Sequence, residues 1–591
     1  MNSVYKERAN GFLDKANIIK NQLIWLSLVR LLAFLIFVFL IFQITQTGSR
    51  WVIAASACSF ALFIFLVNRY GKLQQQKQFY TALADCNEKE DQFLQTNKSP
   101  YDTGSEYEDT QHPYSYDLDL FSQGGLYAFL NRCSTTFGKA QLAESLLQPE
   151  VSAITQRQEA IAELKDKLDF RQKLFAYGNL HPSKKKDLDR LMHWLKEDGH
   201  KINKYLYFAL LIFPITTIGS LIFYLFTENE TAFSLFAKLF VVNLIVAFSF
   251  SKKITSQLSV SGSVTKILKN YSNQFLMIEK EVFQSALLKN LQQTLVKKTA
   301  TASQLIFQLA SLFNYLETVV NLVVSLLLNG LFLFHVHILY RLGNWKKNHA
   351  HEVVNWLQII GKTEALNSFA NLIYNNSGFH FPTTISHPMV KANELGHVLV
   401  NPEKRICNDI LFDQQKFAIL TGSNMSGKST FLRTLGTNII LAKAGSAVCA
   451  KRFIFYPFDV FVSMRITDSL QDSESFFYSE LKRLHAIIEH LKQNKNTFVI
   501  LDEILRGTNS NDKRNGTIGL IKKMAALKAF GIIATHDVVV AELIKDYPDF
   551  IMNKAFESAI INDELKFDYK LKDGVCTTLS ATYLMRKMEI I

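Results

Sequence analysis

Four long apolar runs interrupt a chain whose pattern is otherwise largely helical. They form two pairs, residues 24–44 with 51–67 and residues 205–226 with 233–250, and a short polar connector joins the members of each pair. A helix of about 20 apolar residues crosses the hydrocarbon layer of a bilayer. We therefore predict two transmembrane hairpins, or four transmembrane helices. For the first pair, the alternative is a buried hydrophobic hairpin of a soluble domain.

Basic residues flank the outer ends of both pairs, whereas the connector 227–231 is acidic. Because Lys and Arg concentrate on the cytoplasmic side of membrane proteins, this bias places both ends of each hairpin in the cytoplasm. A cleaved signal peptide is not expected, because the first run is too long and a second span follows at once. The flanking residues are Lys6, Arg8, Lys15, Lys20, Arg69, Lys72, Lys77, Lys201, Lys204, Lys252 and Lys253.

Between and after these runs the pattern changes several times. The first polar stretch predicts a helical stalk followed by a loop, and from Asp117 to Trp194 apolar residues recur at roughly helical spacing. Helical patterning resumes at Ile254. The predicted units are an N-terminal hairpin (1–70), a stalk (71–116), a helical core in two parts (117–204 and 251–385), the second hairpin (205–250) and a C-terminal α/β domain (386–591).

The stretch Thr421–Leu435 contains the pattern Gly-x4-Gly-Lys-Ser. The apolar run 417–420 before it predicts a buried strand and the residues after it predict a helix, which is the context of a phosphate-binding loop rather than of an ordinary glycine-rich turn. Such a loop aims backbone N–H groups at phosphates, while its lysine supplies positive charge and its serine a magnesium ligand. The predicted nucleotide-binding residues are Gly422, Ser423, Asn424, Met425, Ser426, Gly427, Lys428, Ser429 and Thr430.

Two further apolar runs, each predicted to be a strand, end in residues that suit the same chemistry. The first, 497–501, is followed by Asp502 and Glu503, and the second, 530–534, is followed by Thr535 and His536. We expect Asp502, together with Ser429, to hold Mg²⁺, and Glu503 to orient or deprotonate an attacking water. His536 alone would be an ordinary packed or solvated histidine, but at the end of a third strand it is a candidate contact to the γ-phosphate.

Residues 319–340 are also apolar enough for a fifth span. Five crossings would place the phosphate-binding loop outside the cell, where it would have no ATP, whereas four keep it in the cytoplasm. We therefore predict a helix that is buried in protein or lies at the membrane surface. The polar residues that interrupt this run are Asn321, Ser325, Asn329, His335 and His337.

Length, charge and cysteine content limit the possible domain organisation, partners and cysteine chemistry of the protein. At 591 residues the chain is long enough for several domains. Its net charge of +13 favours a polyanionic partner, either nucleic acid or the anionic face of a membrane. The six cysteines include no Cys-x-x-Cys pair, so a disulfide framework and a zinc site are not indicated and reduced, packed thiols are expected.

In these motifs and in its helical core, the sequence resembles the MutS family of DNA mismatch repair ATPases. The resemblance covers about residues 117–200 and 255–590. Its most specific parts are TGSNMSGKSTFLR at the loop, GSAV at 445–448, DEILRGT at 502–508, ATH at 534–536, the family signature at 468–481, HPMV at 387–390, and the helical-core segment 125–149.

The resemblance implies an α/β P-loop ATPase domain of the ABC type, a long all-α core or lever domain, and the use of ATP and Mg²⁺. In family dimers the nucleotide lies between the phosphate-binding loop of one chain and a signature serine of the other, here Ser475. It therefore implies a homodimer in which Glu503, His536 and Ser475 are the catalytic residues.

This sequence also departs from the family. The mismatch-recognition and connector domains are missing, since no Phe-x-Glu wedge occurs before Pro113, and the second hairpin stands where relatives carry a DNA clamp. Val398 stands near the position of an aromatic that stacks on adenine in relatives, which implies weaker base binding. Substitutions in the hydrolysis motifs are Leu505 for glycine, Phe476 for threonine and Ser473 for glycine.

Two functions follow from these observations. The first is an ATPase of the MutS type, anchored in the cytoplasmic membrane by four helices, that hydrolyses ATP in a dimeric sandwich and binds DNA without the mismatch wedge. The alternative is an ATP-driven conformational or signalling protein of the membrane that does not bind DNA. An ABC transporter subunit is disfavoured, because a soluble core separates the hairpins and no Leu-Ser-Gly-Gly-Gln signature is present.

Overall fold

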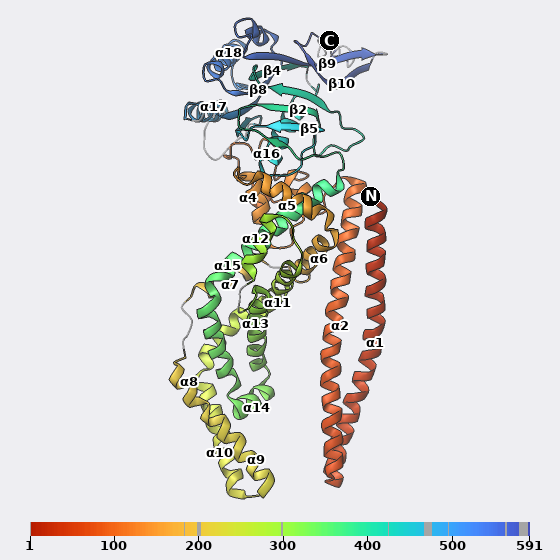
Figure 1. Ribbon diagram of the computed structural model, residues 1–591, viewed down its shortest axis with the longest axis vertical. Helices are drawn as coiled ribbons and strands as arrows, with labels where there is room; N and C mark the ends of the chain where they lie inside the picture. Colours follow the sequence, from red (N-terminus) through yellow and green to blue (C-terminus); the bar gives the residue numbers. More distant parts are fainter. Residues whose placement is uncertain are drawn as a thin grey trace.

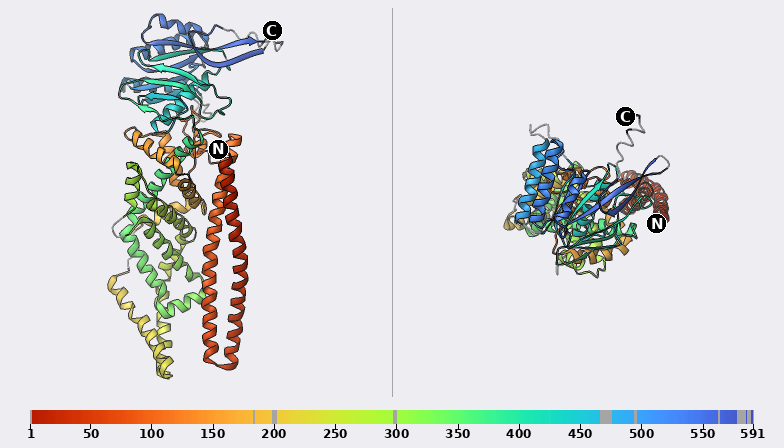
Figure 2. Two further views of the ribbon diagram at one scale, coloured as in Figure 1. Left: turned by 45° about the vertical axis from the view of Figure 1, so that its right-hand side comes forward. Right: turned by 90° about the horizontal axis from the view of Figure 1, so that it is seen from above.

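The protein is elongated, with its sheets at one end, a helical middle, and two helical hairpins that project toward the other end (Figure 1). The two hairpins lie apart from each other at their tips, and the N-terminus lies close to the helical middle (Figure 2). The computed structural model describes residues 2–182, 184–197, 202–296, 300–423, 425–465, 476–493, 496–561, 564–577, 585 and 589–590.

The N-terminal hairpin consists of α1 (Asn2–Thr47) and α2 (Arg50–Thr96), two long helices that pack side by side. The chain reverses at Gly48, whose φ of +59° is a left-handed conformation that glycine adopts without a steric penalty. Ser59 Oγ donates to the Ala33 carbonyl across the hairpin at 3.0 Å. The apolar half of each helix, next to the turn, carries most of the exposed large hydrophobic side chains of the hairpin.

The second hairpin consists of α8 (Lys204–Leu210), α9 (Ile212–Thr227) and α10 (Glu230–Ser249). Asn229 caps the start of α10 by accepting from the Thr231 backbone N–H. Among the described residues, four helical segments are long and apolar enough to cross a membrane, namely Val4–Thr47, Arg50–Thr96, Lys204–Thr227 and Glu230–Ser249.

The helical middle is one continuous core, in which the long helix α15 packs against α4, α5 and α13. Its helices are α3 (Leu126–Leu130), α4 (Thr136–Leu147), α5 (Ile154–Asp166), α6 (Leu168–Asn179), α7 (Lys185–Lys196), α11 (Ser251–Lys280), α12 (Ala286–Leu295), α13 (Ala302–Glu317) and α15 (Phe334–Asn375), with the short 3₁₀ turn η1 (Ser105–Tyr107) before them.

The helical spacing expected from Asp117 onward is wrong for residues 117–125, which form turns. Their apolar side chains are buried all the same, because the segment lies against the α/β domain. The buried Asp117 carboxylate holds it there by accepting the backbone N–H groups of Met464 and Arg465, both at 2.7 Å. The apolar residues of this segment therefore indicated correctly that it is buried. Its turns, however, depend on contacts with residues that are distant in the sequence.

The single helix predicted over residues 319–340 is also wrong. The chain instead forms the 3₁₀ turn η2 (Thr318–Val320), the separate helix α14 (Leu322–Phe332) and the start of α15, with a bend of 111° between α13 and α14. The side chain of Asn321 caps α14 by accepting from the Val324 backbone N–H, and Leu333 ends it with a φ of +49°. A capping residue within the apolar run thus breaks the helix.

The C-terminal region contains a six-stranded sheet, in the order β10-β9-β4-β8-β7-β6, and a four-stranded sheet, in the order β1-β5-β2-β3. The strands are β1 (Thr383–Thr384), β2 (Val390–Leu395), β3 (Asn408–Phe412), β4 (Phe417–Gly422), β5 (Arg452–Phe455), β6 (Asp459–Ser463), β7 (Thr497–Asp502), β8 (Phe530–Thr535), β9 (Ile551–Ile561) and β10 (Glu564–Asp573). The accompanying helices are α16 (Lys428–Lys443), α17 (Phe476–Gln493), α18 (Ser510–Ala526) and the 3₁₀ helix η3 (Val538–Lys545).

The three apolar runs predicted to be strands are β4, β7 and β8, and all three are buried along their whole length. They are neighbouring parallel strands, so their carboxyl ends meet at one edge of the sheet. The residues that follow them in the sequence therefore converge there.

Candidate nucleotide site

The loop between β4 and α16 has the conformation that its glycines allow. Gly427 has a φ of +101°, and an added Cβ would lie 3.0 Å from the Tyr569 ring. At Gly422, an added Cβ would lie 2.7 Å from Ser426 Oγ. The loop leads directly into the N-terminus of α16, whose free backbone N–H groups and helix dipole favour an anion. The strand and helix predicted on either side of it are therefore present.

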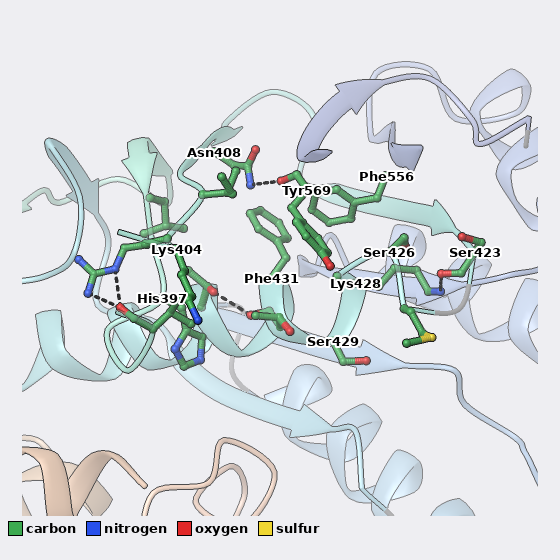
Figure 3. Close-up of a pocket in the computed structure, with 18 of the residues that line it drawn as sticks. His397, Lys404, Asn408, Ser423, Ser426, Lys428, Ser429, Phe431, Phe556 and Tyr569 are labelled. Carbon is green, nitrogen blue, oxygen red and sulfur yellow. Dashed lines mark hydrogen bonds between the residues drawn. The ribbon is translucent and has the colours of Figure 1, made fainter. Parts of the chain in front are cut away.

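Lys428 is the first residue of α16, and its ammonium folds back over the loop. Its Nζ donates to the carbonyls of Gly422 at 2.8 Å and Ser423 at 3.0 Å, as Figure 3 shows for Ser423. The same nitrogen is 3.8 Å from Glu503 Oε1. Burial lowers the pKa of Lys428, and the carboxylates of Glu503 and Asp502 oppose that shift. The loop thus holds one positive charge at its centre.

Ser429 and Asp502 form the candidate cation site. Ser429 Oγ donates to Asp502 Oδ2 at 2.5 Å, so this bond joins the start of α16 to the end of β7. Burial raises the pKa of Asp502, and the hydrogen bond from Ser429 lowers it. Within the described part of the chain, Asp502 Oδ1 and the hydroxyls of Ser423 and Ser426 are buried without a hydrogen-bond partner. Unpartnered oxygens of this kind fit Mg²⁺ and phosphate, respectively.

Glu503 and His536 lie together at the same edge. His536 Nδ1 is 3.5 Å from Glu503 Oε1, and the Glu503 backbone N–H donates to the Ala534 carbonyl at 3.0 Å. Burial raises the pKa of Glu503, but Lys428, His536 and Arg506 outweigh it, so the net pKa lies below the ordinary value. Glu503 is therefore ionised at neutral pH and can accept a hydrogen bond, or a proton, from a water.

Leu505, which stands where the expected motif has glycine, has an unusual backbone conformation. Leu505 has a φ of +60°, a left-handed conformation that glycine adopts without strain but leucine does not. Its backbone N–H donates to Glu480 Oε1 at 2.7 Å, and its buried side chain packs over Gly516, where an added Cβ would lie 2.5 Å from Leu505 Cδ1. The surrounding contacts thus hold a strained residue two positions after Glu503.

These residues open into a cavity of about 450 Å³ that extends from the loop past α16 to the four-stranded sheet (Figure 3). Its walls include Ser423, Met425, Ser426, Gly427, Lys428, Ser429, Thr430 and Glu503. The rest of the wall includes His397, Lys404, Arg405, Asn408, Phe431, Phe556 and Tyr569. The size and the mixture of phosphate-binding and aromatic groups suit a nucleotide.

Two aromatic residues of this wall were missed at the level of sequence. Tyr569, on β10, places its ring over Gly427, and His397 lies on the opposite side of the cavity. Val398, the position expected to face the base, is buried and does not line the cavity. Burial, together with Arg433 and Arg405, lowers the pKa of His397 to about 4, so its ring is neutral. The only sequence signal for Tyr569 was its place in a segment that resembles the last strand of the family.

Some predicted site residues lie outside the described part of the chain. These are Asn424 of the loop and Ser475, together with the rest of 466–475 in the family signature. The described residues therefore bring together Lys428, Ser429, Asp502, Glu503 and His536 in one place.

Comparison with known protein families identifies two MutS domains. The family described as MutS domain III matches residues 110–322, and the family described as MutS domain V matches residues 418–587. These ranges include the first part of the helical core with the second hairpin, and nearly all of the six-stranded sheet with the phosphate-loop side of the cavity.

Individual relatives match between 28% and 40% of this chain. A DNA mismatch repair protein MutS from Thermotoga sp. (strain RQ2) is 35% identical over 173 residues, which are 28% of this chain and 21% of the relative. MutS protein homolog 4 from Homo sapiens is 28% identical over 199 residues, 32% of this chain and 21% of that protein. Endonuclease MutS2 from Leuconostoc citreum is 27% identical over 240 residues, 40% of this chain and 27% of that protein.

The match to the first of these relatives spans about a fifth of its length. The two domain matches, the relatives and the geometry at the end of β4, β7 and β8 agree with one another. The chain belongs to the MutS family.

Proposed function

We propose that this protein is a membrane-anchored MutS-type ATPase that acts as a homodimer and binds DNA. The observation that carries the proposal is the convergence of Lys428, Ser429, Asp502, Glu503 and His536 at the carboxyl ends of parallel strands, where Lys428, Ser429 and Glu503 line a cavity. A lysine, a serine–aspartate pair and an ionised glutamate are the groups that phosphoryl transfer to water requires.

Each residue has a distinct task in the proposed reaction. The loop N–H groups and Lys428 bind the β- and γ-phosphates of ATP, and Ser429 and Asp502 hold Mg²⁺. When bound, the metal neutralises charge on the phosphates. Glu503 orients the attacking water and accepts its proton, and His536 stabilises the charge of Glu503 from 3.5 Å. In the proposed dimer, Ser475 of the second chain closes the site.

The membrane anchor is supported by the surfaces of the hairpins. Trp25, Leu32, Phe39 and Phe65 in the first hairpin and Ile245 in the second each expose more than half of their surface. Soluble proteins rarely present apolar surface on this scale. We propose that both hairpins span the cytoplasmic membrane, with the core and the α/β domain in the cytoplasm.

DNA binding is proposed from family membership and from the net charge of +13. The second candidate is an ATP-driven membrane protein without DNA affinity. It is favoured by one observation: the hairpin α8–α10 lies at the far end of the core, where the clamp of a DNA-binding relative is expected (Figure 1).

The two candidates differ in how their ATPase rate responds to DNA. We expect duplex or branched DNA to change the rate of the detergent-solubilised protein, and the effect to fade as salt rises, because phosphate contacts release counterions. The measurement is the rate at two salt concentrations with and without each DNA, with Glu503→Gln as the inactive control. A rate that depends on Glu503 but not on any DNA would favour the second candidate.

Removal of the Tyr569 ring should weaken nucleotide binding. Base–aromatic stacking is worth about 1–3 kcal/mol, so we expect Tyr569→Ala to raise the Kd for ATP roughly 5- to 140-fold. Tyr569→Phe is the matched control, because it keeps the ring, and it should bind like the wild type. Titration with a fluorescent ATP analogue measures both. Equal loss in the two variants would mean that the hydroxyl, not the ring, carries the contact.

A further inference from the structure

The helix α14 lies across the end of the helical middle, between α13 and α15, and packs against the second hairpin (Figure 1). It is 11 residues long and contains no charged residue, so it has no charged face. Most of its side chains also lie outside the buried core. Its surface has three distinct faces, each with its own set of contacts.

The first face is apolar and open. Leu322, Val323, Leu326 and Leu327 recur at the spacing of one helix face, and they are 71%, 67%, 43% and 52% exposed. Val320, just before the helix, is exposed as well. In contrast, the apolar side chains of α13 that point inward are nearly all buried. This stripe is therefore not an edge of the core.

The second face is polar, and its groups are paired with one another. Asn329 Nδ2 donates to the Ser325 carbonyl at 2.9 Å, and Asn329 Oδ1 accepts the His335 backbone N–H at 3.1 Å. His335 Nε2 lies 3.1 Å from Thr318 Oγ1, and His335 is fully buried. These polar side chains thus turn away from the open face, as they must where water is absent.

The third face fixes the helix to the second hairpin. Gly330 lies against Phe240 of α10, so closely that an added Cβ would lie 2.3 Å from its ring. Asn243 Nδ2 donates to the Gly330 carbonyl at 2.8 Å and to Thr217 Oγ1 of α9 at 3.0 Å. The Gly330 carbonyl is among the last four of α14, which have no partner within the helix, so the hairpin satisfies it.

We propose that α14 is a re-entrant helix that buries its open apolar face among the acyl chains of the bilayer, beside the second hairpin. This inference rests on the proposed membrane anchor. Its support is continuity: Phe240 and Asn243 lie within the apolar length of α10, so the contact places α14 at the depth of the hairpin and its leucines beside the hairpin's lipid-facing surface. The bend before α14 and the reversal at Leu333 return the chain to the side from which it came.

The position of α14 also connects the membrane with the nucleotide site. It is followed directly by α15, which runs along the helical middle and ends at Asn375, shortly before the α/β domain (Figure 1). A movement of α15 that follows nucleotide binding would therefore act on a helix held in lipid, and through Gly330 and Asn243 on the hairpin itself.

Fluorescence quenching in liposomes tests this placement. Single cysteines at Leu326 and Val323, in a background with Cys58→Ser, Cys407→Ser and Cys576→Ser, are labelled with an environment-sensitive fluorophore; the three remaining cysteines are buried. The two control positions are Leu235, which is exposed on α10, and Val151, which is exposed on the surface of the helical middle. The quenchers are a lipid with a spin label on its acyl chain and aqueous iodide.

We expect the lipid quencher to act at Leu326, Val323 and Leu235, and iodide to act at Val151. Quenching of Leu235 by lipid, with Leu326 and Val323 quenched only by iodide, would overturn the re-entrant helix and leave the membrane anchor intact. Iodide quenching at all four positions would overturn the anchor as well.

Discussion

Glu503→Gln should abolish most ATP turnover while leaving ATP binding intact. The substitution removes the carboxylate that accepts a proton from the attacking water but keeps the shape of the side chain. Loss of a general base costs about 10²- to 10⁴-fold in rate, so we expect kcat to fall by about that factor. Lys428 and the Ser429–Asp502 pair do not depend on this carboxylate for their position, since Lys428 is held by two carbonyls and Ser429 by Asp502.

Single-turnover hydrolysis and equilibrium ATP binding together test this result. Glu557→Gln is the matched control, because Glu557 is a partly exposed carboxylate on β9, outside the cavity, whose partner is Lys572 at 3.1 Å. It should hydrolyse ATP at the wild-type rate. If Glu503→Gln retained most of its rate, another group would have to accept the proton, and the role given to Glu503 would be wrong.

Arg132→Met should strongly lower the free energy of unfolding, because it breaks a buried ion pair. Arg132 follows α3 and forms a buried ion pair with Glu90 of α2, and its guanidinium also lies over the rings of Phe93 and Tyr101, 4.8 and 4.3 Å from their centroids. Without Arg132, the hydrogen-bond partners of the buried Glu90 carboxylate among the described residues would all be neutral, such as Asn371 at 3.3 Å. Removal of one member of such a pair costs about 3–5 kcal/mol.

The pair joins the first hairpin to the helical core, so the loss should appear there first. We expect a lower unfolding temperature in detergent and faster proteolysis of residues 97–104, which follow α2. Lys89→Met is the matched control on the same helix, since its pair with Asp85 is at the surface and such pairs are worth about 0–1 kcal/mol. Similar losses in both variants would show that the buried pair has no special role in docking the hairpin.

Parts of this structure could be predicted because they depend on short stretches of sequence. A buried strand followed by glycines, lysine and serine specifies a phosphate-binding loop, and a strand that ends in Asp502 and Glu503 delivers two carboxylates to the same edge. Parallel strands then bring these ends together, and β4, β7 and β8 do so as neighbours. The four apolar helices could also be predicted, because length and composition alone define them.

Other features required the tertiary structure. Tyr569 and His397 enter the cavity from segments far apart in the sequence, and neither carries a local pattern that distinguishes it from an ordinary aromatic side chain. The burial of Glu90 and Arg132 depends on how the first hairpin docks onto the core.

The same limit applies to the run 319–340. Hydropathy indicates that these side chains avoid water, but it does not indicate whether they are buried in protein or in lipid. The Asn321 cap, the left-handed Leu333 and the contact of Gly330 with Phe240 instead set how this run folds, and the last of these depends on packing against the second hairpin. The sequence by itself therefore determined the residues of the candidate nucleotide site and the number of long apolar helices. Only the tertiary structure decided which side chains complete the cavity and how the fifth apolar run folds, because both depend on contacts between residues that are distant along the chain.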